Sequence, residues 1–169
     1  MVREIKMAEV FLICGKIASG KTTYAKQISA KYNAVLLSFD EIMMIFSEAQ
    51  CAESHDNIIE GLQNYLLRKS LEFINAGISV ILDWGFWTQE ERNYINNFYM
   101  VNKIKKEWHY IDVSPIQWRR NIKKRIKSVL NSVENWYYFN DGKTQNTIIV
   151  FEQPKREEMD VWYCNKEEM

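Results

Sequence analysis

The eight residues from Gly15 to Thr22 have the composition and spacing of a loop that binds phosphate. They read Gly-Lys-Ile-Ala-Ser-Gly-Lys-Thr and fit the pattern G-x-x-x-x-G-K-[ST]. Glycines let backbone N–H groups turn inward around a phosphate, and a helix that starts at the loop adds partial positive charge. Lys21 can reach the β- and γ-phosphates, and the Thr22 hydroxyl can ligate Mg²⁺. The run predicts a site for a nucleoside triphosphate with Mg²⁺; the alternative is a glycine turn before a capped helix.

The residues expected to contact the nucleotide form one continuous stretch. They are Gly15, Lys16, Ile17, Ala18, Ser19, Gly20, Lys21, Thr22 and Thr23. ATP is the expected nucleotide, with GTP as the alternative. A GTPase-type switch is disfavoured, because no N/T-K-x-D segment of the kind that recognises guanine is found.

Two aspartates follow apolar runs that have the character of strands. Asp40 comes after the run 34–38 and could accept a proton from an attacking hydroxyl, or could cap a helix. Asp83 comes after the run 78–82 and could hold Mg²⁺ beside the phosphate loop, or could be a turn residue. The aromatic residues of the segment 84–87 could wall an acceptor pocket or could pack under the next helix.

Three arginines are candidates for contacts with the transferred phosphate or the acceptor. Arg92 lies nine residues after Asp83 and could point back toward the site, or could be a solvated helix charge. Arg120 and Arg125 belong to the strongly basic segment 118–127, in which residues four apart share a helix face. They could close over the triphosphate as part of a lid, or form an ordinary solvated face.

Alternating strands and helices must position these residues. Mainly apolar runs predict strands at 10–14, 34–38, 78–82 and 108–113, with a last strand at 161–164. Helical spacing and capping residues predict helices over about 21–32, 56–76, 88–101 and 115–130, with a short helix after residue 38. This order predicts an α/β protein with a parallel sheet covered on both faces. Ligands of such sheets bind at the carboxyl ends of the strands, where Gly15, Asp40 and Asp83 are expected.

Length and composition limit the classes of protein that fit. The 169 residues suit a single domain, and the 22 basic and 22 acidic residues give a formal net charge of zero. A neutral chain disfavours a dedicated nucleic-acid binder. The three cysteines are far apart and have no metal-ligand spacing, and no run approaches the length of a membrane span. The expected location is the cytoplasm.

Together these motifs resemble the small P-loop kinases of the chloramphenicol phosphotransferase, zeta-toxin and polynucleotide 5′-hydroxyl kinase type. The resemblance runs from about Val10 to Pro154, and only its phosphate loop is highly specific. It implies a three-layer P-loop NTPase fold of about five parallel strands, in one domain over 1–169 with a helical lid at about 118–147. It also implies that Asp40 is the base that activates the acceptor hydroxyl. The paired lid arginines of the family match Arg125 at the second position, whereas Asn121 stands at the first, where Arg120 is the substitute.

The leading hypothesis is an ATP- and Mg²⁺-dependent phosphotransferase that acts on an alcohol group of a small molecule or nucleoside. In this hypothesis Lys21, Asp40, Arg92, Arg120 and Arg125 are catalytic, and Thr22 and Asp83 hold the metal. A polynucleotide 5′-hydroxyl kinase is the near alternative. A regulatory ATPase or switch with a protein partner is the alternative from another class. The sequence does not name the acceptor or the oligomeric state.

Overall fold

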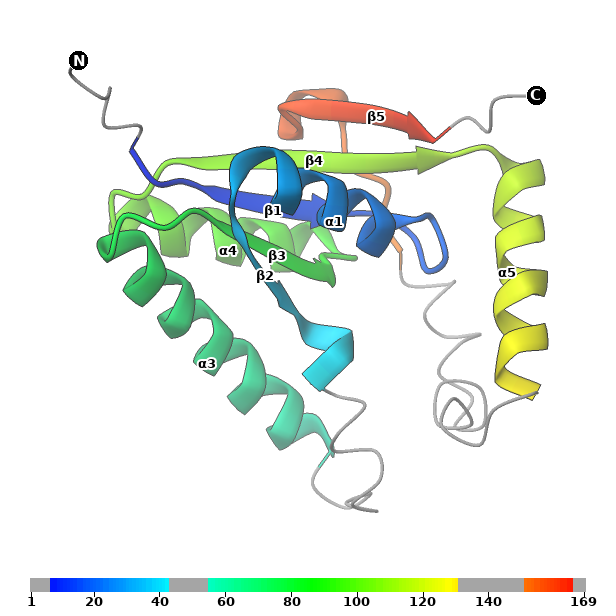
Figure 1. Ribbon diagram of the computed structural model, residues 1–169, viewed down its shortest axis with the longest axis horizontal. Coiled ribbons are helices and arrows are strands. Elements are labelled where there is room, and N and C mark those ends of the chain that lie inside the picture. Colours follow the sequence, from blue (N-terminus) through cyan, green and yellow to red (C-terminus); the bar gives the residue numbers. More distant parts are fainter. Residues whose placement is uncertain (1–6, 43–54, 131–150, 166–169) are drawn as a thin grey trace.

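The computed structural model describes residues 7–42, 55–130 and 151–165 (Figure 1). The strands are β1 (Val10–Cys14), β2 (Val35–Ser38), β3 (Val80–Gly85), β4 (Lys106–Val113) and β5 (Val161–Asn165). The helices are α1 (Lys21–Tyr32), α3 (His55–Asn75), α4 (Gln89–Val101), α5 (Pro115–Leu130) and the short 3-10 helix η3 (Arg156–Glu158). A further helix starts at Phe39, and residues 39–42 of it are described.

The five strands form one sheet in the order β2-β3-β1-β4-β5, and each neighbouring pair is parallel. This confirms the predicted α/β fold with about five parallel strands. The central strand β1 is completely buried, as its all-apolar sequence requires when both faces of a sheet are covered.

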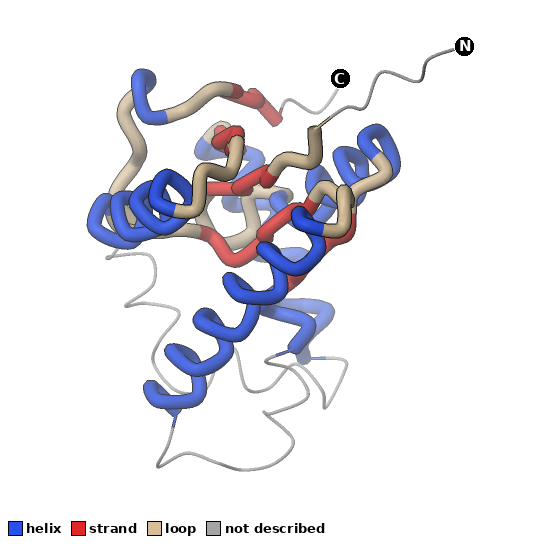
Figure 2. Tube along the Cα trace, turned by 90° about the vertical axis from the view of Figure 1, so that its left-hand side faces the viewer, coloured by secondary structure: helices blue, strands red, loops and turns tan. Residues whose placement is uncertain are grey.

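Helices cover the two faces of the sheet, so the described part of the chain forms three layers. Alternate side chains of β1 enter two different cores, because successive residues of a strand point to opposite faces. Phe11 and Ile13 pack with α1, whereas Val10 and Leu12 share a core with residues of α3 and α4. Figure 2 looks along the strands and shows helices on both sides of the sheet.

The bounds of β3 differ from the sequence prediction. The strand starts at Val80 rather than Ile78 and continues to Gly85, so Asp83 lies inside the strand rather than after it. The extension arises because β3 stays paired with β1 as far as Cys14 and Gly85. An apolar run alone ends at Leu82 and does not reveal this pairing.

Local capping sets where the other site elements begin. Thr88 caps α4, and its hydroxyl accepts a hydrogen bond from the Glu91 N–H at 3.1 Å. The helix after β2 is capped by Ser38, whose hydroxyl accepts from the Glu41 N–H at 3.4 Å. Asp40 therefore lies in the first turn of that helix and is not its cap.

A buried polar chain ties α1 to the sheet. The Tyr24 hydroxyl lies 2.7 Å from Nδ1 of His109, and Nε2 of the same ring lies 2.8 Å from the Glu107 carboxylate. Tyr24 is the fourth residue of α1, the helix that follows the phosphate loop. These hydrogen bonds therefore fix the direction in which α1 leaves the loop.

The predicted lid falls mainly outside the described residues. Residues 118–130 of it belong to α5, and residues 131–147 lie outside the described residues. Among the described residues, we find no helix of the length and apolarity needed to cross a membrane.

Candidate nucleotide and phosphate site

The phosphate loop, Asp40 and Asp83 lie at the carboxyl edge of the sheet. The phosphate loop leaves β1 there, and the register places Ser38 of β2 opposite Asp83 of β3. In Figure 1 the strands point toward α5, and the loop between β1 and α1 lies on the side of the sheet where α5 stands. The edge therefore has the phosphate loop, the two acids Asp40 and Asp83, and a basic helix around it.

The phosphate loop is compact and folded around its own lysine. The Lys21 ammonium donates hydrogen bonds to the carbonyl oxygens of Gly15 at 3.1 Å and Lys16 at 2.8 Å. A Cβ at Gly15 would lie 2.8 Å from the Ser19 hydroxyl oxygen, so this position requires glycine. Gly20, with φ of 98°, is the left-handed residue from which α1 starts.

Thr22 and Asp83 form a direct contact between the loop and β3. The Thr22 hydroxyl donates a 2.8 Å hydrogen bond to Oδ2 of Asp83, which is 3% exposed. Hydroxyl and carboxylate oxygens are ligands that Mg²⁺ accepts. The two predicted metal ligands are thus brought together, and their donor chemistry fits this ion. In the described part of the chain, no cluster of three or more His, Cys, Asp or Glu side chains could hold a metal.

Burial perturbs the two opposite charges at the centre of the site. It lowers the pKa of the Lys21 ammonium, although the carboxylates of Asp83 and Asp40 oppose this shift. It raises the pKa of Asp83, although Lys21 and the hydrogen bond from Thr22 oppose this shift. Both groups lack hydration and therefore favour partners of opposite charge.

Asp40 lies at the rim of the site with an exposed side chain. Its charge acts on both Lys21 and Asp83, which places it in the same cluster. Because Ser38 caps the helix, the capping alternative for Asp40 does not hold.

The Arg92 guanidinium is buried and lies outside this cluster. The side chain is 1% exposed, and its Nε donates to the Glu158 carboxylate at 2.8 Å. Its Nη1 donates to the carbonyl oxygens of Phe86, Trp87 and Glu152. Both sequence interpretations, an acceptor contact and a solvated charge, differ from this arrangement, in which Arg92 joins the start of α4 to the segment 151–158.

The basic helix α5 contacts the loop through different residues from those expected. Arg120 is exposed, and Arg125 is partly buried and close enough to lower the pKa of Lys21. The direct loop contacts come from Trp118 and Asn121, which hydrogen-bond to the carbonyl oxygens of Ile17 and Ala18. The sequence placed Asn121 at the first of the family's two lid-arginine positions, and a spacing of three residues puts Trp118 on the same helix face.

Two of the aromatic residues after Asp83, Trp84 and Phe86, pack in different places. Phe86 is completely buried and packs edge-on against Trp108, with ring centroids 4.9 Å apart. Trp84 is partly buried and packs against Leu62 and Leu66 of α3, with Phe39 at 6.3 Å between centroids. Packing explains Phe86, whereas Trp84 lies beside the helix that carries Asp40.

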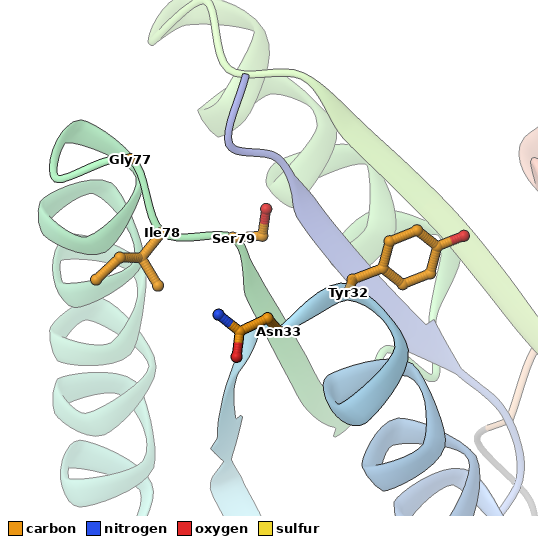
Figure 3. Close-up of a pocket in the computed structure, with 5 residues that line it drawn as sticks. All are labelled: Tyr32, Asn33, Gly77, Ile78 and Ser79. Carbon is orange, nitrogen blue, oxygen red and sulfur yellow. The ribbon is translucent and has the colours of Figure 1, made fainter. Parts of the chain in front are cut away.

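A shallow pocket occurs elsewhere and is not part of this site. It is lined by Tyr32, Asn33, Gly77, Ile78 and Ser79, which directly precede β2 and β3 (Figure 3). These residues are at the amino end of the strands, whereas the phosphate loop is at their carboxyl end.

Comparisons with known proteins agree with this architecture. A family model described as "AAA domain" matches residues 10–134. A putative kinase from Chloroflexus aurantiacus superposes with a TM-score of 0.69 at 14% identity, covering 94% of this chain and 88% of that one. The APS kinase of Mycobacterium tuberculosis, solved with AMPPNP and APS, gives 0.68 at 16% identity, covering 96% and 91%. A gluconokinase from Sinorhizobium meliloti gives 0.56 at 13% identity, covering 94% and 82%. The search of curated proteins gives no match.

Proposed function

Because the chain belongs to the AAA domain family, we propose that it is an ATP- and Mg²⁺-dependent phosphotransferase. Its acceptor is an alcohol group of a small molecule or nucleoside. The observation that carries the proposal is the 2.8 Å contact between Thr22 and Asp83 directly after the phosphate loop, with Asp40 at the neighbouring strand end. The likeness to solved kinases supports the fold on which this chemistry depends.

The loop and its lysine bind the nucleotide phosphates. Lys21 now donates to two loop carbonyls, and it is desolvated, so phosphate oxygens are better partners for its ammonium than carbonyls. Thr22 and Asp83 would hold Mg²⁺, which when bound neutralises negative charge on the phosphates. Positioning and charge neutralisation are the main contributions of the protein in phosphoryl transfer.

Asp40 accepts the proton of the acceptor hydroxyl. Its side chain is exposed at the rim, on the same strand edge as the metal-binding pair, and does not cap its own helix. A hydroxyl that approaches the γ-phosphate over this edge comes within reach of the carboxylate. Arg125, whose charge reaches Lys21, and Arg120 on the same helix then neutralise charge on the transferred group. Arg92 stabilises the frame of the site instead of binding the acceptor.

The test is a phosphotransfer assay with Mg²⁺-ATP over a panel of sugars, nucleosides, antibiotics and oligonucleotide 5′ ends. We expect Asp40→Asn to lower turnover by about 100-fold or more while Mg²⁺-ATP still binds, since a general base contributes this much. Asp83→Asn should instead weaken Mg²⁺-dependent nucleotide binding. Glu41→Gln is the matched control, because Glu41 is the exposed acid next to Asp40 on the same helix.

Three outcomes would contradict the proposal in different ways. Full activity of Asp40→Asn would remove Asp40 as the base. Release of free phosphate alone, over the whole panel, would indicate an ATPase or switch. Transfer to oligonucleotides only, with steep loss of acceptor binding in salt, would indicate a polynucleotide kinase.

A further inference from the structure

Side chains of α5 hold the tip of the phosphate loop. The Trp118 indole N–H donates to the Ile17 carbonyl oxygen at 2.8 Å, and the Asn121 amide donates to the Ala18 carbonyl oxygen at 2.9 Å. Gln117 donates to the Asn121 side-chain oxygen at 2.8 Å, so the NH₂ group of Asn121 faces the loop. The helix and the loop are more than 100 residues apart in sequence.

These two hydrogen bonds fix two successive peptide planes. In a trans peptide the N–H points opposite to the C=O of the same plane. A donor on the Ile17 carbonyl therefore turns the Ala18 N–H away from α5, and a donor on the Ala18 carbonyl does the same for the Ser19 N–H. The Ser19 N–H donates within the loop, to the Lys16 carbonyl oxygen at 3.2 Å.

The loop needs such support because of its own backbone. Ala18 has φ of 57°, a left-handed conformation that is unfavourable for a residue with a Cβ. Residues in such conformations persist only when surrounding structure holds them. At Ala18, α5 supplies hydrogen bonds to the carbonyl oxygen before it, that of Ile17, and to its own carbonyl oxygen.

We propose that Trp118 and Asn121 are positioning residues that set the orientation of the phosphate-loop amides. That the ligand of those amides is a nucleotide phosphate rests on the proposed function, whereas the contacts between α5 and the loop do not depend on it. Because α5 also carries Arg120 and Arg125, a shift of this helix changes the loop amides and the arginines together. The shape of the loop and the position of α5 are then one coupled feature of this chain.

The first test needs no nucleotide. Hydrogen–deuterium exchange is measured for the loop amides in the full chain with Trp118→Phe, which keeps an aromatic ring without the N–H, and with Asn121→Leu, which keeps the branch at Cγ without the amide. We expect the Ser19 amide, which donates to the Lys16 carbonyl, to exchange at least about tenfold faster in each variant, while β1 and α4 amides keep their rates. Lys123→Gln, an exposed change on the same helix, should leave every rate unchanged.

The second test measures Mg²⁺-ADP binding by calorimetry. Each variant should bind about tenfold more weakly than the wild type, the loss expected when one hydrogen bond no longer positions the donors of the site. Unchanged loop exchange in both variants would overturn the positioning role, and so would equal acceleration at all amides, which indicates global destabilisation. Faster loop exchange in a chain that binds no nucleotide at all would keep the positioning role and refute the proposed function.

Discussion

Cys14 is the last residue of β1, and its thiol lies directly before the phosphate loop. The side chain is completely buried and its S–H donates to the Phe86 carbonyl oxygen at 3.4 Å. Burial raises the pKa of this thiol to about 12. A raised thiol pKa favours the neutral form at every pH below 12, and the thiolate is the reactive species.

We therefore predict that Cys14 is inert to alkylation in the folded protein. With iodoacetamide at pH 8, the exposed Cys164 should react at least about 100 times faster than Cys14, because almost no Cys14 thiolate is present. Peptide mass spectrometry over a time course measures both rates, and unfolding in urea should make them equal. Comparable rates in the folded chain would show that the end of β1 opens to solvent.

At the scale of elements, Arg92 links three pieces of structure. Its contacts join the start of α4, the β3–α4 connection and the segment 151–158. The same segment is held by the Glu152 N–H, which donates to the Trp87 carbonyl at 2.9 Å. Since β3 carries Asp83, this linkage supports the strand on which the proposed metal ligand lies.

Loss of the Arg92–Glu158 ion pair should destabilise the fold. Arg92→Ala removes one partner of a buried pair and should cost about 3 kcal/mol in the free energy of unfolding, measured in urea. Lys69→Gln, which removes the exposed pair with Glu72 on α3, is the control and should leave the urea midpoint unchanged. An unchanged midpoint for Arg92→Ala would mean that the segment 151–158 is held without this residue.

The same pair predicts how stability depends on pH. Burial alone would raise the pKa of Glu158, but the hydrogen bonds from Arg92 and the Lys155 N–H lower it below its usual 4.5. The folded state therefore keeps this carboxylate ionised when the unfolded state takes up a proton. Its contribution is present above pH 4.5 and is lost as the pH falls through the folded-state pKa. Glu158→Gln should show a shallower loss of stability between neutral and acidic pH than the wild type.

Short-range sequence patterns predicted the helices and strands. The surroundings of individual site residues depend on long-range contacts, which those patterns do not reveal. Apolar runs and caps such as Thr88 located the strands and helices, and the edge rule of parallel sheets located Asp83. The burial of Arg92 depends on Glu158, which is 66 residues away, and no local pattern reveals it. The loop contact of Asn121 likewise depends on α5 crossing the sheet edge.

For the whole molecule, one sheet and its cores connect the loop to nearly every described element. β1 pairs with both β3 and β4, and its side chains enter both cores. The loop thus lies on the strand with the most extensive packing, and a ligand on the loop should stabilise the chain as one unit. If the chain is a single domain, as its length predicts, it should therefore unfold as one unit.

We predict one cooperative thermal transition that Mg²⁺-ADP moves upward. At a ligand concentration 100 times Kd, binding adds about 2.7 kcal/mol, which raises Tm by roughly 5–10 °C for a chain of this size. Calorimetry measures the transition. Lys21→Gln should abolish the rise because it removes the ammonium that the loop folds around, whereas Lys26→Gln, an exposed change on α1, should rise like the wild type. Two transitions, of which only one moves, would contradict a single domain, and no rise in the wild type would contradict nucleotide binding.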